Sequence, residues 1–265
     1  MGVKFEIDRQ SLPTEYRDYS LIPTSDGVVS TLYLLDDRYA LKIYDDETPQ
    51  QSIDEEISLL SHIATLKVPQ IVDTFRVDGK RAILYTQISG ESPSEPSLEQ
   101  ISQIGRFLSD LHTTTQGMSS SNPDIFGKAH LERLISTIHH PTLHHHYATI
   151  ECHLRVDGII HGDLFRDNAK FEGDRLSGVF DFSDACVGDF RFDLAVVALD
   201  WCFDGENLDS TKLNTLLESY HHQSITTEEL LLYLRYALLR YATSREVGGY
   251  KDSEVLLRRL EGLEI

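Results

Sequence analysis

The first 88 residues contain apolar-rich runs in pairs, as strands joined by tight turns do. Val28–Leu35 and Arg38–Tyr44 flank an Asp-Asp dipeptide, and Ile71–Val77 and Arg81–Ile88 flank an Asp-Gly dipeptide. Short apolar runs on either side of such turn residues are typical of β-hairpins. This part of the chain therefore predicts two hairpins.

Between the two hairpins, apolar residues repeat at helical spacing. Ile53, Ile57, Leu60 and Ile63 are separated by four, three and three residues, which places them on one face of a helix within Thr48–Leu66. The first 88 residues thus predict a small β-rich lobe that includes one helix.

The pattern changes at Ser89–Pro96, which is rich in Gly, Pro and Ser, as a linker between lobes would be. Beyond it the chain is mainly helical, apart from two strand-like runs at Asn168–Phe171 and Leu176–Phe182. The expected helices are Leu98–Leu111, Ala129–Arg155 with a break at Pro141, Phe190–Phe203, Ser210–His221, Thr226–Val247 and Ser253–Leu263. We therefore predict an α+β fold of two lobes, residues 1–88 and residues 89–265.

Composition narrows the classes of partner. The net charge of -19 argues against a nucleic-acid surface, which needs clustered Lys and Arg, and suits a cationic or zwitterionic small molecule. No apolar run is long enough to span a bilayer, and the N-terminus has no apolar signal region, so a cytoplasmic location is the default expectation. The cysteines, Cys152, Cys186 and Cys202, have no C-x-x-C spacing and are expected to be reduced structural thiols.

The segment HGDLFRDN, which begins at His161, has the spacing H-x-D-x-x-x-x-N and is followed by Asp181 in DFS. This is the layout of a kinase catalytic centre. Phosphoryl transfer needs a carboxylate that accepts the proton of the attacking hydroxyl, and an Asn and a second Asp that hold Mg²⁺ on the nucleotide phosphates. The spacing assigns Asp163 to the first role and Asn168 and Asp181 to the second.

The flanking residues support this interpretation over a chance match of a few fixed positions. The strand-like runs at Asn168–Phe171 and Leu176–Phe182 surround a Gly-Asp turn, which predicts a hairpin. Such a hairpin would return Asp181 to the side of the loop that carries Asp163.

Lys42, in YALKIY, lies on the second strand of the first predicted hairpin. In a kinase-like lobe, a Lys at this place reaches the α- and β-phosphates of ATP and pairs with a carboxylate on the next helix. Glu56 is the best candidate partner, because it continues the apolar side of that helix, and Glu55 is the second choice. The alternative is an ordinary surface Lys, since Lys42 occupies the face opposite to Leu41 and Ile43.

The loop that covers the nucleotide would be Ser25–Ser30. Its single glycine, Gly27, does not reproduce the G-x-G-x-x-G pattern of protein kinases, so a plain β-turn explains the loop equally well. Backbone groups at Thr86, Gln87 and Ile88, between the two lobes, are the expected site of adenine recognition.

Six histidines between His139 and His153 raise the alternative of a metal site. They lack an H-x-x-x-H spacing with a carboxylate on a secure helix, and Pro141 interrupts them. A solvated helix face or loop is the better interpretation.

Together these residues resemble the aminoglycoside phosphotransferase superfamily, small-molecule kinases that share the protein-kinase fold. The segment HGDLFRDNAKFEGDRLSGVFDF and the following DLAVVALDWCFD look like the type II homoserine kinase branch, over residues 158–245. The N-terminal lobe is similar only at the level of the superfamily.

The resemblance implies an ATP- and Mg²⁺-dependent kinase that phosphorylates a small-molecule alcohol. It carries Asp163 over as the catalytic base, and Asn168 and Asp181 as Mg²⁺ ligands. It also implies that His161 braces the catalytic loop and that Asp193, in the DLA segment, supports that loop from the following helix.

The chain departs from the branch at several positions. Gly162 replaces the usual Ala, Ser183 follows DF where protein kinases have Gly, and Leu199-Asp200-Trp201 lacks the Asn of NDWC. L-homoserine is the first choice of acceptor, and an aminoglycoside, choline or a sugar is the alternative. An inactive pseudokinase that serves as a binding module is a third interpretation, which the complete set of catalytic residues disfavours. The oligomeric state stays open.

Overall fold

The first predicted hairpin is formed by β2 (Ser30–Leu35) and β3 (Tyr39–Tyr44) in the computed structural model, which describes residues 6–24 and 30–263. Asp36 and Asp37 at its tip have φ values of 49° and 52°. The loop that joins the strands has three residues, since Leu35 pairs with Tyr39, and Arg38 N donates to Leu35 O at 3.0 Å. Left-handed values at both central positions are those of a type I′ turn. The chain divides into two compact units, Met1–Ser89 and Gly90–Ile265.

In the first unit, the strands form one five-stranded sheet in the order β1-β2-β3-β5-β4, with antiparallel neighbours. The strands not yet given are β1 (Leu21–Pro23), β4 (Ile71–Val77) and β5 (Lys80–Thr86). One face of the sheet carries Leu41 and Ile43 into a buried cluster that includes Leu12. Side chains of the opposite face reach helix α1 (Gln50–His62), so that both faces are used.

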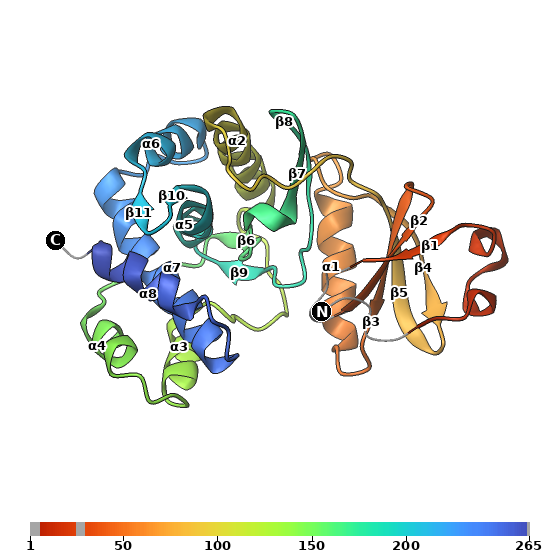
Figure 1. The fold of residues 1–265 in the computed structure, drawn as a ribbon, viewed down its shortest axis with the longest axis horizontal. Coiled ribbons are helices and arrows are strands. Elements are labelled where there is room, and N and C mark those ends of the chain that lie inside the picture. Colours follow the sequence, from red (N-terminus) through yellow and green to blue (C-terminus); the bar gives the residue numbers. More distant parts are fainter. Residues whose placement is uncertain (1–5, 25–29, 264–265) are drawn as a thin grey trace. The chain divides into compact units, whose positions relative to one another are not determined.

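In the second unit, helix α5 (Phe190–Trp201) is buried along almost its whole length, because FRFDLAVVALDW has few polar positions. It packs against α2 (Leu98–Thr115), α6 (Ser210–Ser219) and α7 (Thr227–Val247), which surround it in Figure 1. Further helices are α3 (Lys128–Ile135), α4 (Pro141–Thr149) and α8 (Ser253–Gly262). Within the described residues, no helix is both long and apolar enough to cross a bilayer.

Short strands pair close to these helices. The pairs are β6 (Gly158–Ile160) with β9 (Cys186–Gly188), β7 (Ala169–Glu172) with β8 (Arg175–Val179), and β10 (Phe203–Asp204) with β11 (Asn207–Leu208). Short 3₁₀ helices are η1 (Arg9–Ser11), η2 (Thr14–Tyr16) and η3 (Arg166–Asn168). The pair β7–β8 is the hairpin predicted after the HGDLFRDN segment.

Two sequence-based boundaries were wrong. The helix expected to continue to Arg155 ends at Thr149, and the strand expected to continue to Phe182 ends at Val179. Beyond Thr149 the backbone bonds to other elements instead of to itself: Arg155 N donates to Asp189 Oδ2 at 2.7 Å, and His153 O accepts from the Tyr233 hydroxyl at 3.2 Å. These tertiary hydrogen bonds replace the helical ones that local propensity favours.

The predicted linker at Ser89–Pro96 is tied to the β7 strand. Glu91 N donates to Phe171 O at 3.0 Å, and Phe171 N donates to Glu91 O at 2.9 Å. Gly90 has a φ of 93°, and a Cβ there would lie 2.2 Å from Phe171 O. Only a glycine allows the backbone to approach β7 so closely.

Candidate active site

The HGDLFRDN loop runs from the end of β6 through η3 into β7, and it brings Asp163 and Asn168 together. Asn168 Nδ2 donates to Asp163 O at 2.8 Å and to Asp163 Oδ2 at 3.2 Å. From helix α7, the Tyr241 hydroxyl donates to Gly162 O and lies 3.4 Å from Asp163 Oδ1. The Asp163 carboxylate is therefore oriented from two sides.

The β7–β8 hairpin returns the chain to this loop. Phe180 N donates to Asn168 O at 3.0 Å, directly before Asp181. Asp181 has a φ of 63°, which is unfavourable for a residue with a side chain, and Ser183 Oγ donates to its carboxylate. Backbone strain of this kind recurs at functional sites.

His161 joins the loop to the end of the hairpin. It is fully buried; its Nε2 lies 3.2 Å from Phe180 O, and its Nδ1 accepts from Asp163 N at 3.3 Å. One nitrogen donates and the other accepts, which is the pattern of a neutral imidazole. Burial lowers the pKa of His161, in agreement with that state. A single side chain thus couples the positions of Asp163 and the Asp181 segment.

Asp193 of α5 holds the start of the loop. Its carboxylate is fully buried and accepts from His161 N at 2.9 Å, from Gly162 N at 2.8 Å and from His112 Nε2 at 3.0 Å. Burial alone would raise the pKa of Asp193, but the hydrogen bond and charge of His112, with His161 and Gly162, lower it below the ordinary value. The carboxylate therefore serves as an ionised anchor for two loop amides.

Several residues that hold the loop were missed by sequence reasoning. Arg166, inside the motif, forms a two-pronged ion pair with Asp200, with Nε–Oδ2 3.0 Å and Nη2–Oδ1 3.1 Å. Next to Asp200, Trp201 is fully buried and donates from Nε1 to Leu164 O at 3.0 Å, so it holds the loop from the core. In the sequence, Asp200 and Trp201 stand out only because the Asn of the NDWC pattern is absent before them, and nothing there indicates contacts with the loop. No spacing signal connects the anchor His112 to this loop.

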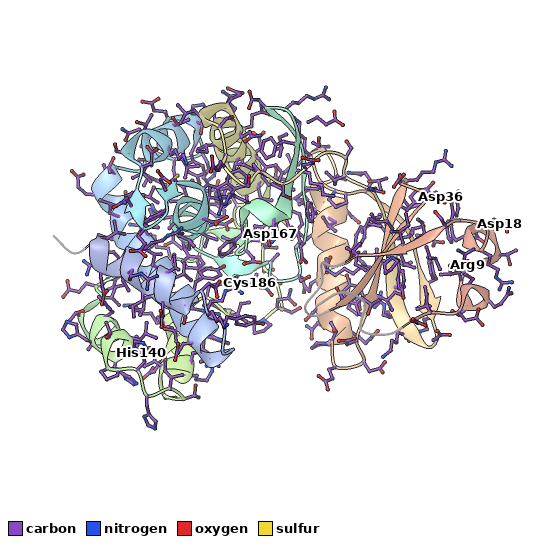
Figure 2. All side chains as sticks on the ribbon, viewed as in Figure 1. Arg9, Asp18, Asp36, His140, Asp167 and Cys186 are labelled. Atoms are coloured by element: carbon purple, nitrogen blue, oxygen red, sulfur yellow. The ribbon has the colours of Figure 1, made fainter. Side chains whose placement is uncertain are left out.

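The loop region carries several carboxylates, among them Asp163, Asp181 and Asp167. Asp167 is exposed and is labelled in Figure 2. Burial, together with the neighbouring Asp184, Asp181 and Asp167, raises the pKa of Asp163 to about 8. A divalent cation would offset this mutual repulsion. The carboxylate and amide oxygens of Asp181 and Asn168 are of the kind that Mg²⁺ prefers.

The described residues contain no cluster of three His, Cys, Asp or Glu side chains that could hold a metal ion by themselves. Mg²⁺ does not need one, because it keeps several waters and is bound through one or two carboxylates and substrate phosphates. Three of the six histidines lie on α4 and His140 caps its N-terminus. His140 is drawn well away from Asp167 in Figure 2. The donor set at the HGDLFRDN loop thus fits Mg²⁺.

Replacing Gly162 by Ala is expected to reduce the free energy of unfolding by about 3 kcal/mol. Gly162 has a φ of 78°, and an added Cβ would lie 2.2 Å from Cε2 of Phe126. Urea unfolding gives the change. Gly173→Ala is the matched control, because Gly173 has a φ of 60° with open space around it and should lose only about 1–2 kcal/mol. Equal losses of unfolding free energy in Gly162→Ala and Gly173→Ala would show that contact with Phe126 is not the reason why position 162 requires a glycine.

In the first unit, Lys42 lies in a buried polar network with α1. Its Nζ is 3.0 Å from Glu56 Oε1, and the hydroxyls of Tyr44 and Tyr85 donate to the same carboxylate at 2.8 and 2.9 Å. Lys42 and Glu56 are 8% and 5% exposed, so Lys42 is no ordinary surface lysine. Of the two candidate partners, the structure pairs it with Glu56 rather than with Glu55.

The other positions expected to bind nucleotide are less defined. Gly27 lies outside the described residues. Thr86 N donates to Gln70 O and Gln87 N donates to Arg38 O, both at 2.9 Å, so these two N–H groups are already used. Ile88 is half-buried and follows directly after them.

The three cysteines are free and buried, which agrees with structural thiols. Burial raises the pKa of Cys152 and of Cys186 to about 12.

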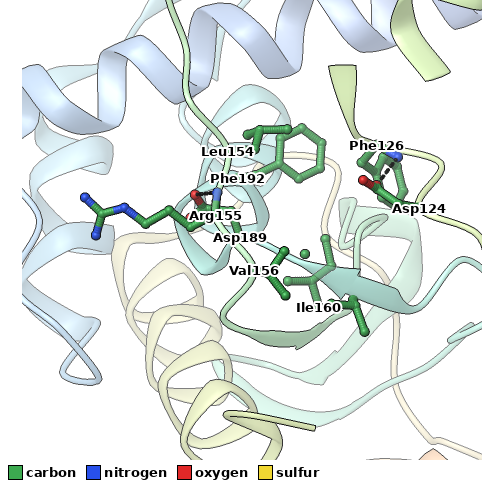
Figure 3. Close-up of a pocket in the computed structure, with 10 residues that line it drawn as sticks. Asp124, Phe126, Leu154, Arg155, Val156, Ile160, Asp189 and Phe192 are labelled. Carbon is green, nitrogen blue, oxygen red and sulfur yellow. Dashed lines mark hydrogen bonds between the residues drawn. The ribbon is translucent and has the colours of Figure 1, made fainter. Parts of the chain in front are cut away.

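A small cavity lined by Phe126, Ile160 and Phe192 has a volume of about 30 Å³ (Figure 3). This volume is enough for a water molecule but too small for a substrate.

The family described as the phosphotransferase enzyme family matches residues 20–224 of the chain. A homoserine kinase from Janthinobacterium sp. (strain Marseille) is 28% identical over 248 residues, which cover 82% of this chain and 77% of that protein.

Two solved structures share the fold. Aminoglycoside 2'-phosphotransferase-IIIa in its GDP complex has a TM-score of 0.68 at 16% identity, covering 94% of this chain and 95% of that one. Choline kinase LicA from Streptococcus pneumoniae has a TM-score of 0.69 at 16% identity, covering 92% of each chain. At such identities the likeness shows the fold alone, and it confirms the predicted α+β architecture.

Proposed function

The chain belongs to the phosphotransferase enzyme family and has its protein-kinase-like α+β fold, and from this premise we propose that it transfers the γ-phosphate of ATP to the hydroxyl of L-homoserine. That it is a small-molecule kinase follows from the family and from the homoserine kinases that match it. The proposal is carried by one observation, a hydrogen-bonded arrangement around Asn168. The Asn168 side chain donates to Asp163, and the Asn168 carbonyl oxygen accepts from Phe180 N, directly before Asp181.

In the proposed reaction, Asp163 accepts the proton of the acceptor hydroxyl as that oxygen bonds to the γ-phosphorus and the bond to ADP breaks. Asn168 and Asp181 would hold Mg²⁺, which supplies positive charge to the phosphate oxygens when bound. His161 and Asp193 keep the loop in position. In the first unit, Lys42, held by Glu56, would bind the α- and β-phosphates.

We further propose that residues 1–88 form the nucleotide-binding lobe and residues 89–265 the catalytic and acceptor-binding lobe. Gly27 and the backbone at Thr86, Gln87 and Ile88 complete the proposed nucleotide contacts. GDP occurs in the complex of one structural neighbour, so the use of GTP in place of ATP belongs among the tests.

Homoserine is preferred as acceptor because relatives such as the one that is 28% identical to this chain carry that name, whereas the aminoglycoside and choline kinases, at 16% identity, share only the fold. The second candidate is an aminoglycoside, choline or a sugar. An inactive binding module is disfavoured, because Lys42, Asp163, Asn168 and Asp181 are all present.

An acceptor screen tests the proposal. Purified protein with ATP and Mg²⁺ is given homoserine, choline, sugars and aminoglycosides, and ADP release and the phosphorylated product are measured. We expect rapid transfer to homoserine that is abolished by EDTA and restored by added Mg²⁺. Transfer to an aminoglycoside with none to homoserine would reject the proposed acceptor, and absence of transfer to any alcohol would reject the kinase activity.

A further inference from the structure

The loop at residues 120–127 contains a buried hydrogen-bond acceptor that lacks a donor. Asn122 Nδ2 donates to Ala185 O at 3.0 Å, which fixes the orientation of the amide. Its Oδ1 is buried and has no hydrogen-bond partner within the described part of the chain. Such an orphaned group in a native protein requires an explanation, and a donor on a bound ligand is one.

The same loop contacts a buried cation that forms no direct ion pair within the described residues, although Asp184 and Asp124 act on it electrostatically. Arg240 of α7 is 5% exposed; its Nε and Nη2 donate to Ile125 O at 3.1 and 2.9 Å, and its guanidinium lies 5.5 Å from the centre of the Phe126 ring. Among residues 6–24 and 30–263, no carboxylate lies within ion-pair distance of it. The Ile125 carbonyl oxygen accepts from two of its nitrogens and the Phe126 ring faces the guanidinium, but neither carries a full negative charge.

Both groups border the catalytic loop. The Phe126 ring under Arg240 is the ring that fills the space beside Gly162, and Tyr241, next to Arg240, contacts Asp163. Asn122 is hydrogen-bonded to the carbonyl oxygen of Ala185, the last residue of the segment Asp181–Ala185. Asp184 in that segment acts electrostatically on both Asp163 and Arg240.

We propose that Arg240 binds the carboxylate, and Asn122 Oδ1 accepts from the ammonium, of a zwitterionic amino acid whose side-chain hydroxyl faces Asp163. The inference rests on the proposed function and narrows it to acceptors with a free α-carboxylate. A ligand that presents an anionic group to Arg240 and a hydrogen-bond donor to Asn122 has the two groups of an α-amino acid, its carboxylate and its ammonium. Choline, a sugar and a polycationic aminoglycoside have no carboxylate for Arg240, so the pair separates homoserine from the other candidates.

The first test uses the wild-type protein and altered acceptors. Homoserine amide and 3-aminopropan-1-ol keep the hydroxyl and the amine but lack the carboxylate, and each is expected to have a kcat/KM about 100-fold or more below that of homoserine. N-acetylhomoserine, which has no ammonium group, should be about 10-fold worse or more. If the amide is phosphorylated as well as homoserine, the role of Arg240 is rejected, while the kinase function stands.

The second test uses variants. Arg240→Met should raise KM for homoserine about 100-fold and leave KM for ATP within about twofold, and the preference for homoserine over its amide should almost disappear. Arg240→Lys, which keeps the charge, should recover part of this loss. Arg106→Met is the matched control, because it removes an exposed arginine of α2 in the same unit. An unchanged KM for homoserine in Arg240→Met would overturn the inference.

Two further measurements keep the test decisive. If Arg240→Met does not fold, as judged by its circular dichroism, Asn122→Leu carries the test, with an expected rise of about 10-fold in KM for homoserine. If the wild-type protein transfers phosphate to no acceptor, calorimetry with homoserine decides: binding that is weakened in these variants supports the pair, and absence of binding overturns it.

Discussion

Replacing Asp163 by Asn is expected to lower kcat for the acceptor about 1000-fold or more, while the Kd for ATP changes less than about threefold. The reason is that Asp163 is proposed to act on the acceptor hydroxyl and not on the nucleotide. An amide at this position can still accept from Asn168 Nδ2, so the loop geometry is kept and only the proton acceptor is lost. Steady-state kinetics and calorimetry with ATP measure the two quantities.

Asp110→Asn is the control, because it makes the same chemical change at an exposed position of α2. It should leave kcat and the Kd for ATP unchanged. Near-normal turnover by the Asp163 variant would reject Asp163 as the base. A large loss of ATP affinity would instead show that its carboxylate contributes to nucleotide binding.

Replacing Asp193 by Ala is expected to reduce the free energy of unfolding by about 3–5 kcal/mol, one of the largest effects of any single change in the chain. The carboxylate is fully buried, and its loss leaves the N–H groups of His161 and Gly162 and the ring of His112 without their acceptor. Urea unfolding gives the change, and kcat/KM should fall with it because the loop loses its anchor. Asp110→Ala, at the surface, should change the stability by less than about 0.5 kcal/mol.

The pH dependence of this difference is a sharper test. The pKa of Asp193 is lower in the folded protein, so its contribution is complete above the ordinary value of about 4 and is lost as pH falls through the folded value. The stability gap between wild type and Asp193→Ala should therefore be constant from about pH 5 to pH 8 and shrink below about pH 4. A gap that stays the same at low pH would mean that Asp193 acts through packing alone.

Much of the fold follows from local patterns. The Asp-Asp and Asp-Gly dipeptides mark both hairpins of the sheet, because few residues accept the left-handed backbone that such turns need. The helices α1, α2, α5, α6, α7 and α8 lie within a few residues of their expected bounds, since apolar periodicity and capping residues are local properties. The helix expected through Arg155 was wrong where backbone groups found distant partners, which no local pattern contains.

The sequence by itself determined the chemistry expected of the site. Asp163 and Asn168 lie in one short loop, and the hairpin that follows brings Asp181 back beside it, so the spacing in the sequence is enough to predict that these side chains lie close together. The pairing of Lys42 with Glu56 could also be predicted from the sequence, because it joins a strand to the helix that directly follows it in the chain. The anchors of the loop were decided only by the tertiary structure. His112, Asp200 and Tyr241 come from helices that pack together through their apolar faces. Because this packing depends on the whole chain, no local spacing in the sequence predicts their polar contacts.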